Sequence, residues 1–163
     1  IKQADDERLI TLITPFMNER HKLTVDEIVH KRLIAGMPEL KDRAKTLVQL
    51  TDEAAFYARE IPYDFDEQAQ NILDNDALEV LDLILIQTKS TDTFNAETVQ
   101  NICKEVAKEL RNGKLGKVAM PLRAALTGTT VSPSVFHAAE LLGKQETIAR
   151  IEYAMEKYGN KIQ

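Results

Sequence analysis

The side chains of this sequence that are best suited to chemistry are six cations within twenty consecutive residues: Lys104, Lys108, Arg111, Lys114, Lys117 and Arg123. Only Glu105 and Glu109 are acidic in this stretch. Cations at such a density can contact the phosphates of a nucleic acid, and arginine can also donate paired hydrogen bonds to a base. The solvated face of an ordinary helix would carry the same residue types, and composition alone does not decide between these two interpretations.

The charge of the chain is unevenly distributed around these cations. Its 163 residues have a formal net charge of −5, which by itself argues against a nucleic-acid partner. Residues 1–100 carry 11 basic and 20 acidic side chains, a net charge of −9, whereas residues 101–163 carry 10 basic and 6 acidic ones, a net charge of +4. Such an asymmetry can mark a partner surface confined to one half of a protein, although helical surfaces also vary in charge without any function.

Motifs of catalysis and metal binding are absent from the sequence. It contains no phosphate-binding G-x-x-x-x-G-K-[ST] loop and no H-E-x-x-H zinc motif. The three histidines, His21, His30 and His137, lack the spacing of metal ligands, and Cys103 falls in the apolar stripe of a predicted helix. We therefore expect no catalytic residue, no metal site and no cofactor within this chain.

A Ser-Pro pair follows the cations and is predicted to begin a helix, with Ser132 as its N-cap and Pro133 in its first turn. Such a helix start exposes N–H groups that can bind a base or a phosphate, but a plain cap has the same residues. Earlier, Pro121 interrupts a helical apolar pattern, and a proline inside a helix costs about 3 kcal/mol. The helix is therefore predicted to kink or restart near Met120, which would set the position of Arg123.

Helical patterns account for most of the chain, and its low content of glycine and proline, 6 and 5 residues, argues against a strand-and-turn protein. A helix is expected over residues 5–20, with Pro15 kinking or ending it. A capping box at Thr24 predicts a second helix that stops at Gly36, and Pro38 would open a third. Further helices are predicted over 46–57 with Thr46 as cap, over 76–88, over 95–112 with Asn95 as cap, and from 144 onward. The expected fold class is all-α with no substantial sheet.

The Ile61-Pro62 step breaks this helical pattern, because a residue before proline disfavours the helical conformation. We interpret it as a hinge that divides the chain into a subdomain of residues 1–62 and a second subdomain of residues 63–163. No apolar run is long enough to span a membrane, and no signal-peptide pattern opens the chain. Since the sequence begins at Ile1 within a helical pattern, we expect a piece of a longer protein.

Several motifs occur together along the chain: A-K-T-L at 44–47, G-K-V-A-M-P-L-R-A-A-L-T-G at 116–128, S-P at 132–133 and L-L-G-K at 141–144. The first of them is followed by the pair Phe56-Tyr57. Together they resemble the C-terminal anticodon-binding region of bacterial-type glutamyl-tRNA synthetases. The resemblance covers almost the whole chain. It implies a helical-bundle subdomain followed by an anticodon-binding subdomain of the α-helix-cage type.

The resemblance also implies roles for particular residues. Arg123 matches an arginine at the anticodon. Ser132 and Pro133 match a Thr/Ser-Pro pair that reads the first anticodon base by backbone and side-chain contacts, and Val135, nearby, is also expected at the anticodon. Arg43 lies in the region where an arginine reads the third base and favours glutamate tRNA over glutamine tRNA. The expected partner is glutamate tRNA, with glutamine tRNA left open, and the five cations that precede Arg123 are candidate contacts to its phosphates.

In that family this region follows a catalytic domain whose motifs, resembling H-I-G-H and K-M-S-K-S, do not occur in this chain. The piece is therefore expected to bind the anticodon and to be inactive alone. The parent enzyme would use ATP and Mg²⁺ to attach glutamate to tRNA. We expect a monomer that works in the cytoplasm together with the rest of the parent synthetase and without a membrane. The alternative is a helical protein–protein interaction module whose apolar groove takes a partner helix.

Overall fold

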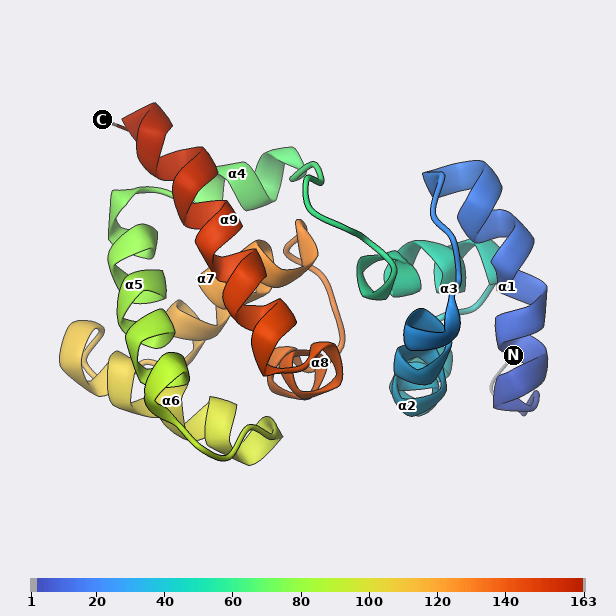
Figure 1. The fold of residues 1–163 in the computed structure, drawn as a ribbon, viewed down its shortest axis with the longest axis horizontal. Helices are drawn as coiled ribbons and strands as arrows, with labels where there is room; N and C mark the ends of the chain where they lie inside the picture. Colours follow the sequence, from blue (N-terminus) through green and yellow to red (C-terminus); the bar gives the residue numbers. More distant parts are fainter. Residues whose placement is uncertain (1–2, 163) are drawn as a thin grey trace. The chain divides into compact units, whose positions relative to one another are not determined.

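The computed structural model describes residues 3–162 of the chain, and their side chains as far as Gly159. The chain forms two compact units, Ile1–Glu60 and Ile61–Gln163. The first unit contains α1 (Asp6–His21), α2 (Glu27–Arg43), α3 (Leu47–Ala54) and a 3-10 turn, Ala55–Tyr57. The second unit contains α4 (Glu67–Ile72), α5 (Asn75–Ser90), α6 (Ala96–Leu110), α7 (Gly116–Thr127), α8 (Val135–Leu142) and α9 (Lys144–Ile162) (Figure 1). No strand occurs between residues 3 and 162, so the predicted all-α fold class is confirmed.

Side chains that precede the helices supply most of the helix caps. Thr46 and Asn95 each accept a hydrogen bond from the N–H group three residues on, and both predicted caps are confirmed. The cap predicted at Thr24 is wrong, because Asp26 accepts the N–H of Val29 at 2.8 Å and α2 begins after it. An aspartate caps a helix at least as well as a threonine, and its charge also interacts favourably with the helix dipole.

Prolines inside three helices do not end them. Pro15 lies within α1, Pro38 within α2 and Pro121 within α7. Of the two alternatives at the first, a kink or a helix end, the end is wrong, and of those near the third, a kink or a restart, the restart is wrong; the kinks stay predictions. The separate element predicted at the second is also wrong. Each proline removes one backbone hydrogen bond, but the turns on either side bury apolar side chains whose packing offsets that loss. In α7 the side chains before and after the proline, Val118 and Leu122, are both 0% exposed.

Gly36 lies in the middle of α2 rather than at its end, which corrects the predicted helix stop. A Cβ atom at this position would lie 3.0 Å from the ring of Tyr57. The glycine therefore permits a close approach between α2 and the 3-10 turn. Arg32 strengthens the same contact, since its guanidinium donates to the carbonyl oxygen of Tyr57 at 2.9 Å.

The three α-helices of the first unit pack around a shared apolar core. Its fully buried members include Ile13, Met17, Leu33, Met37, Leu40 and Leu50. At the end of α1, the guanidinium of Arg20 donates two hydrogen bonds to the carboxylate of Asp52 on α3, at 3.0 and 2.8 Å. His21 lies 2.7 Å from the same carboxylate. The core packs α2, whose last residue is Arg43, against α1 and α3, and the polar cluster joins α1 to α3.

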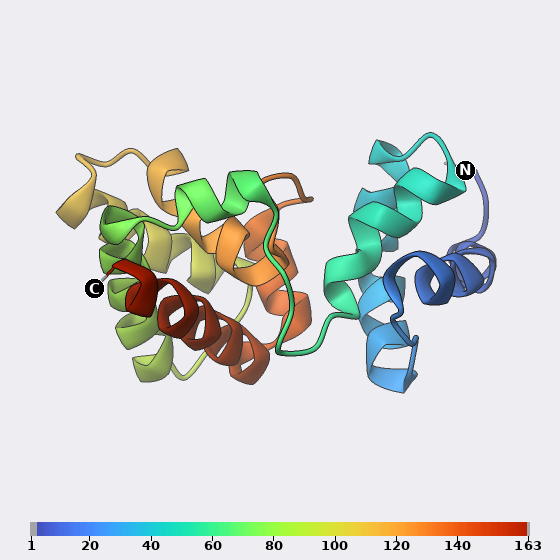
Figure 2. The ribbon, with the colours of Figure 1, turned by 90° about the horizontal axis from the view of Figure 1, so that it is seen from above.

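Helix α7 is the central helix of the second unit, because it contacts α4, α5, α6, α8 and α9. Figure 2 shows it, in orange, among those helices. Its buried face includes Val118, Leu122 and Leu126. Arg123 is half-buried at the edge of that face. A helix packed on several sides therefore positions the arginine that the sequence singles out.

Residues 58–66 join α3 and its 3-10 turn to α4 without regular helix, as Pro62 predicts. Tyr63 in this segment is nonetheless buried, and its hydroxyl donates to the carbonyl oxygen of Ala125 on α7 at 2.7 Å. Its own carbonyl oxygen accepts the hydroxyl of Tyr153 on α9 at 2.9 Å. From this tyrosine onward the segment is packed against the second unit, so only the few residues before it are left as connection.

Candidate nucleic-acid interface

Two of the predicted site residues, nine positions apart in the sequence, are hydrogen-bonded to each other. The Nε of Arg123, on α7, donates to the Oγ of Ser132 at 2.9 Å. The same hydroxyl donates to the carbonyl oxygen of Pro133 at 2.7 Å. The structure thus brings together the arginine and the Ser-Pro pair, which lies in the connection between α7 and α8.

This connection, residues 128–134, is called the α7–α8 loop below, and neighbouring segments hold it in place. It begins at Gly128, whose φ of 74° is easily reached by glycine and rarely by other residues. The carbonyl oxygen of Gly128 accepts the N–H of Asp66 at 2.9 Å. The hydroxyl of Thr130 donates to the side chain of Gln68 on α4 at 2.9 Å, and that of Thr129 donates to the carbonyl oxygen of Val131 at 2.9 Å. The loop is therefore tied to α4 at its start and to Arg123 near its end.

The start of α8 differs from the sequence-based prediction. Its N-cap is Ser134, whose Oγ accepts the N–H of His137 at 3.4 Å, and not Ser132. Because α8 begins at Val135, Ser132 lies too early to cap it, and its hydroxyl bonds instead with Arg123 and the Pro133 carbonyl. The unpaired N–H groups expected at a helix start accordingly belong to residues two positions later than predicted.

Burial separates the predicted site residues into two groups. Ser132 is 8% exposed and Val135 is 1% exposed, and Pro133 is also buried. Arg123 is half-buried, whereas Val131 is 61% exposed. The side chains of the Ser-Pro pair and of Val135 thus face the protein interior. A ligand arriving from solvent meets the arginine, the backbone of the α7–α8 loop and the exposed valine first.

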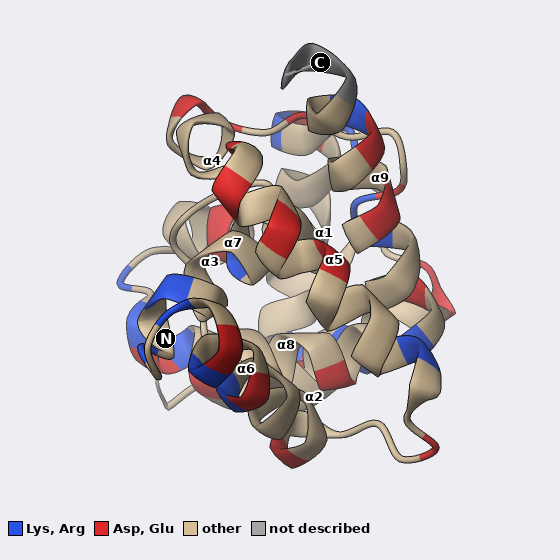
Figure 3. Ribbon diagram, turned by 90° about the vertical axis from the view of Figure 1, so that its left-hand side faces the viewer, with Lys and Arg blue, Asp and Glu red and all other residues tan. Residues whose placement is uncertain are grey.

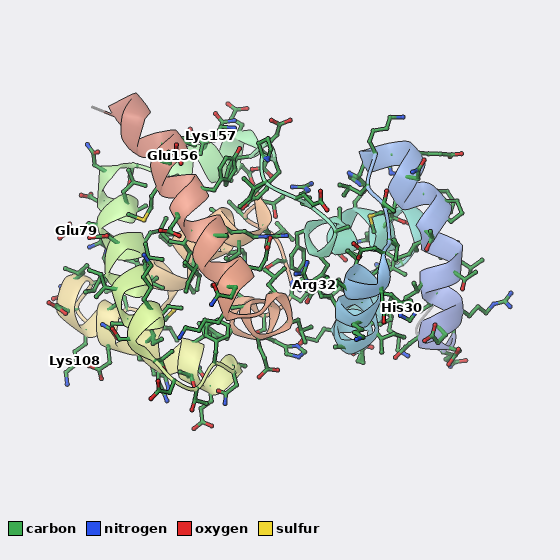
Figure 4. The ribbon with its side chains drawn as sticks, viewed as in Figure 1. His30, Arg32, Glu79, Lys108, Glu156 and Lys157 are labelled. Carbon is green, nitrogen blue, oxygen red and sulfur yellow. The ribbon has the colours of Figure 1, made fainter. Side chains whose placement is uncertain are left out.

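The cations that precede Arg123 differ in how far they are available. Lys104, Lys108, Lys114 and Lys117 are exposed. The side chain of Lys108 points away from α6 in Figure 4. On the same helix Glu105 and Glu109 are also exposed, so both signs of charge share that surface (Figure 3). These lysines can contact phosphates without any rearrangement of the helix.

Arg111, in contrast, is engaged in holding two helices together. Its guanidinium donates to its neighbour's carbonyl oxygen, that of Leu110, at 2.7 Å and to the carbonyl oxygen of Asp76 at 2.9 Å. These bonds join the end of α6 to the start of α5. A guanidinium committed to two carbonyl oxygens has fewer N–H groups left for a phosphate.

A pocket of about 310 Å³ opens beside Arg111, between the starts of α5 and α7. Arg111 and Lys117 line it together with Asp74 and Asp76. Since two cations and two carboxylates share its wall, the pocket has no net preference for an anion. It does not add a phosphate site to the exposed lysines.

Arg43 is the one predicted site residue in the first unit. It is the last residue of α2, and its Nε lies 3.8 Å from the Oε1 of Glu53. The side chain of Arg43 is 39% exposed, so the loose ion pair leaves it accessible to solvent. The second carboxylate oxygen of Glu53 is buried and has no hydrogen-bond partner.

In the part of the chain that the structure describes, potential metal ligands are not grouped and the one cysteine is buried. No group of three or more histidine, cysteine, aspartate and glutamate side chains in that part could hold a metal ion. Cys103 is fully buried, and burial raises the pKa of its thiol to about 12, which makes it a poor nucleophile. None of the helices described between residues 3 and 162 has both the length and the apolar character of a membrane span.

Sequence reasoning missed Arg150, which is 0% exposed. Its Nη1 donates to the carbonyl oxygen of Leu126 at 2.7 Å, and its Nε donates to Glu146 at 2.9 Å. Its guanidinium also lies 5.4 Å from the centre of the Tyr63 ring. Arg150 therefore secures the last turn of α7, just beyond Arg123. The only signal in the sequence is a glutamate four residues before the arginine, which is equally typical of a surface pair.

Comparison with known proteins relates this geometry to function. A family model described as an anticodon binding domain matches residues 8–155. Glutamate–tRNA ligase 2 of Rhodospirillum rubrum is 40% identical over 154 residues, which cover 94% of this chain and 33% of the ligase. Glutamate–tRNA ligase 1 of Gluconacetobacter diazotrophicus is 40% identical over 151 residues, which cover 93% of this chain and 32% of the ligase. The chain thus spans about a third of the length of these curated relatives.

Solved structures give the same relationship. A glutamate tRNA ligase from Elizabethkingia meningosepticum superimposes with a TM-score of 0.73 at 25% identity, over 94% of this chain and 29% of that one. A glutamate-tRNA synthetase from Elizabethkingia anophelis gives a TM-score of 0.70 at 26% identity, over 95% of this chain and 29% of that one. The helical arrangement therefore matches one region of longer tRNA ligases.

Proposed function

This chain belongs to the family of anticodon binding domains, and on that basis we propose that it is the part of a longer glutamate–tRNA ligase that reads the anticodon of tRNA. The observation that carries the proposal is the hydrogen bond between Arg123 and Ser132 within a loop that is itself tied to α4. It gives an arginine with planar donors a fixed place beside the α7–α8 loop. That combination suits recognition of an unpaired base.

The chemistry of the site fits a hairpin loop of RNA. Proteins read RNA sequence mainly where bases are unpaired and splayed out, as in an anticodon loop. Arg123 supplies N–H donors to a base edge, and the backbone of the α7–α8 loop supplies further polar groups. Pro133 and Val135, being buried, act by packing beneath that loop rather than by side-chain contact with a base.

Phosphate contacts fall to the exposed lysines, Lys104, Lys108, Lys114 and Lys117. Such contacts orient RNA without reading its sequence, and they weaken as salt rises. Arg111 supports them by joining the end of α6, which carries Lys104 and Lys108, to the start of α5, because its guanidinium is committed to carbonyl oxygens of Leu110 and Asp76. The lysines thus contribute to the affinity for RNA, and Arg123 contributes to the selection of its sequence.

The parent enzyme would attach glutamate to tRNA with ATP and Mg²⁺, using catalytic residues outside this chain. The relatives are glutamate–tRNA ligases, which supports tRNA for glutamate as the partner. We also propose the cytoplasm as the compartment. Arg43 is our candidate for reading the third anticodon base, the position at which glutamate and glutamine tRNAs are told apart. We also propose that the parent acts as a monomer.

Substitution of Arg123 tests the proposal most simply. We expect Arg123→Ala to weaken binding of a glutamate anticodon stem-loop by about 1–3 kcal/mol, with the helical circular dichroism spectrum unchanged. A fluorescence-anisotropy titration at fixed salt measures the affinity. Arg8→Ala removes the same charge from an exposed site on α1 and serves as the matched control. If Arg123→Ala binds the stem-loop as tightly as the unaltered chain, this assignment of the site is overturned.

A further inference from the structure

We propose that Ser132 is a positioning residue whose hydroxyl holds the guanidinium of Arg123 in place for RNA and does not itself contact a base. The inference rests on the proposed function and makes the two residues work as a pair. The guanidinium of Arg123 contacts the base, and the hydroxyl of Ser132 orients the guanidinium. The resemblance to a base-reading Thr/Ser-Pro pair would instead give the serine a direct contact of its own.

The hydrogen bonds of the hydroxyl are the first support for this role. A serine hydroxyl has one proton to donate and two lone pairs that accept. Here the proton goes to the carbonyl oxygen of Pro133 at 2.7 Å, and one lone pair accepts the Nε–H of Arg123 at 2.9 Å. The only donor of the group is thus used within the protein. A base that needs a donor from Ser132 would have to break a short internal bond.

Burial is the second support. Ser132 is 8% exposed, whereas Arg123 is only partly buried. RNA approaching from solvent therefore reaches the guanidinium before it reaches the hydroxyl. The hydroxyl therefore acts on binding through its partners within the protein, the guanidinium of Arg123 and the carbonyl oxygen of Pro133.

The fixed backbone around Ser132 makes the hydroxyl an effective anchor. The loop is bonded to Asp66 through Gly128 and to Gln68 through Thr130. An arginine side chain has many rotamers, and freezing them on binding lowers affinity. Because this hydrogen-bonded loop already holds the Nε of Arg123, part of this ordering is complete before RNA arrives. The protein then fixes the orientation of the guanidinium plane, and with it the directions in which the N–H groups can donate.

A double-mutant cycle tests the inference. The affinity of a glutamate anticodon stem-loop is measured for the unaltered chain, Ser132→Ala, Arg123→Ala and the double variant. We expect Ser132→Ala to weaken binding on the order of tenfold, and the double variant to bind no more weakly than Arg123→Ala alone. Residues that act as a unit give this non-additive result, whereas independent contacts with RNA would multiply their losses.

Further variants separate positioning from simple loss of structure. Ser132→Thr keeps the hydroxyl and should retain at least half of the affinity. Ser132→Cys keeps the volume of the buried side chain but replaces the oxygen with a weakly bonding sulfur, so it should behave like Ser132→Ala. Ser90→Ala removes a hydroxyl from the exposed end of α5 and should leave binding unchanged. Thermal unfolding of each variant monitors the fold, and Ser132→Cys takes the place of Ser132→Ala in the cycle if the latter does not fold.

The outcomes distinguish this inference from the proposed function. If the losses of Ser132→Ala and Arg123→Ala multiply in the double variant, Ser132 contacts RNA independently and the inference is wrong while the anticodon site stands. If Ser132→Ala binds normally, the hydroxyl does not position the arginine. If Arg123→Ala itself binds normally, the anticodon site fails, and the inference fails with it.

Discussion

The single cysteine, Cys103, lies buried among the apolar side chains of α6, and burial raises the pKa of its thiol to about 12. Since only the thiolate is nucleophilic, almost none of the reactive form exists near neutral pH. We expect the folded chain not to react with Ellman's reagent at pH 8 during a period in which the chain unfolded in urea reacts completely. Reaction of the folded chain at the unfolded rate would contradict this placement of the side chain.

Asp52 gives a pH dependence to the first unit. Partial burial of its carboxylate opposes ionisation, but hydrogen bonds and charge from Arg20 and His21 outweigh it and lower the pKa of Asp52 below its ordinary value of 3.8. A lowered pKa in the folded state means that the ionised carboxylate stabilises the fold above pH 3.8, and that this stabilisation is lost as the pH falls through the folded-state value. The pair is partly exposed, so its contribution is small.

Asp52→Asn should therefore lower the free energy of unfolding by less than about 1 kcal/mol at pH 7, with the difference from the unaltered chain closing below pH 3.8. Urea unfolding at a series of pH values measures both effects. Asp42→Asn removes an exposed carboxylate from α2 of the same unit and is the control. A difference that stays constant down to the lowest pH would show that the ion pairs of Asp52 do not stabilise the fold.

For single residues, the sequence shows which residues are candidates for the site but not which contacts they make. The resemblance picks out Arg123 and Ser132, but their mutual hydrogen bond depends on the path of the α7–α8 loop, which no local pattern encodes. Val135 is predicted beside the anticodon and is 1% exposed, because tertiary packing decides which face of α8 is covered. Whether a side chain is buried or hydrogen-bonded depends on its neighbours in space, and these come from distant parts of the chain.

Among the helices, α7 matters most because it contacts every other helix of the second unit and positions Arg123. Its last turn is held by long-range bonds: Tyr63 donates to the Ala125 carbonyl oxygen, and Arg150 donates to that of Leu126. A helix end normally leaves such carbonyl oxygens without helical partners. Here buried side chains from the segment before α4 and from α9 satisfy them.

Arg150→Met should accordingly destabilise the second unit. The substitution keeps much of the volume but leaves the buried carbonyl oxygen of Leu126 without its donor, which costs about 1–3 kcal/mol. Urea unfolding followed by circular dichroism measures the loss, and Arg8→Met on the exposed face of α1 is the control. An unfolding midpoint equal to that of the unaltered chain would contradict the role assigned to Arg150.

The helices themselves are predicted well where local signals decide. The caps at Thr46 and Asn95 follow from side chains within three residues of the bonds that they make. The helix ends predicted at Gly36 and at the prolines fail for a common reason. Packing between elements outweighs local preference, as the approach of the Tyr57 ring to Gly36 shows. A contact across 21 residues cannot be read from either residue's surroundings in the sequence.

At the scale of the whole molecule, the uneven distribution of charge along the chain decides where an anionic partner is attracted. The chain carries a net charge of −5, yet residues 101–163 carry 10 basic and 6 acidic side chains. An anionic partner is therefore repelled by most of the chain and attracted to its C-terminal part, where the exposed lysines and Arg123 lie. The sequence predicts this division because charge can be counted. It does not predict that Arg111 is committed to carbonyl oxygens of its own unit.

The lysines should control salt dependence without affecting selectivity. We expect Lys117→Gln to weaken binding of cognate and loop-scrambled stem-loops equally, and to reduce the slope of log affinity against log salt by about 1. Titrations at four or more salt concentrations give that slope. Lys31→Gln on α2, which removes another exposed charge, should leave it unchanged. A change in the preference between the two RNAs would mean that Lys117 reads sequence.

The most direct measurement compares two RNA hairpins that share a stem, one with the glutamate anticodon loop and one with the same loop bases scrambled. At one fixed salt concentration the unaltered chain should bind the cognate hairpin more tightly by at least roughly tenfold, and Arg123→Ala should remove most of that preference. A helical module that binds other proteins would show no such preference. Equal affinity of the unaltered chain for both hairpins would contradict the account.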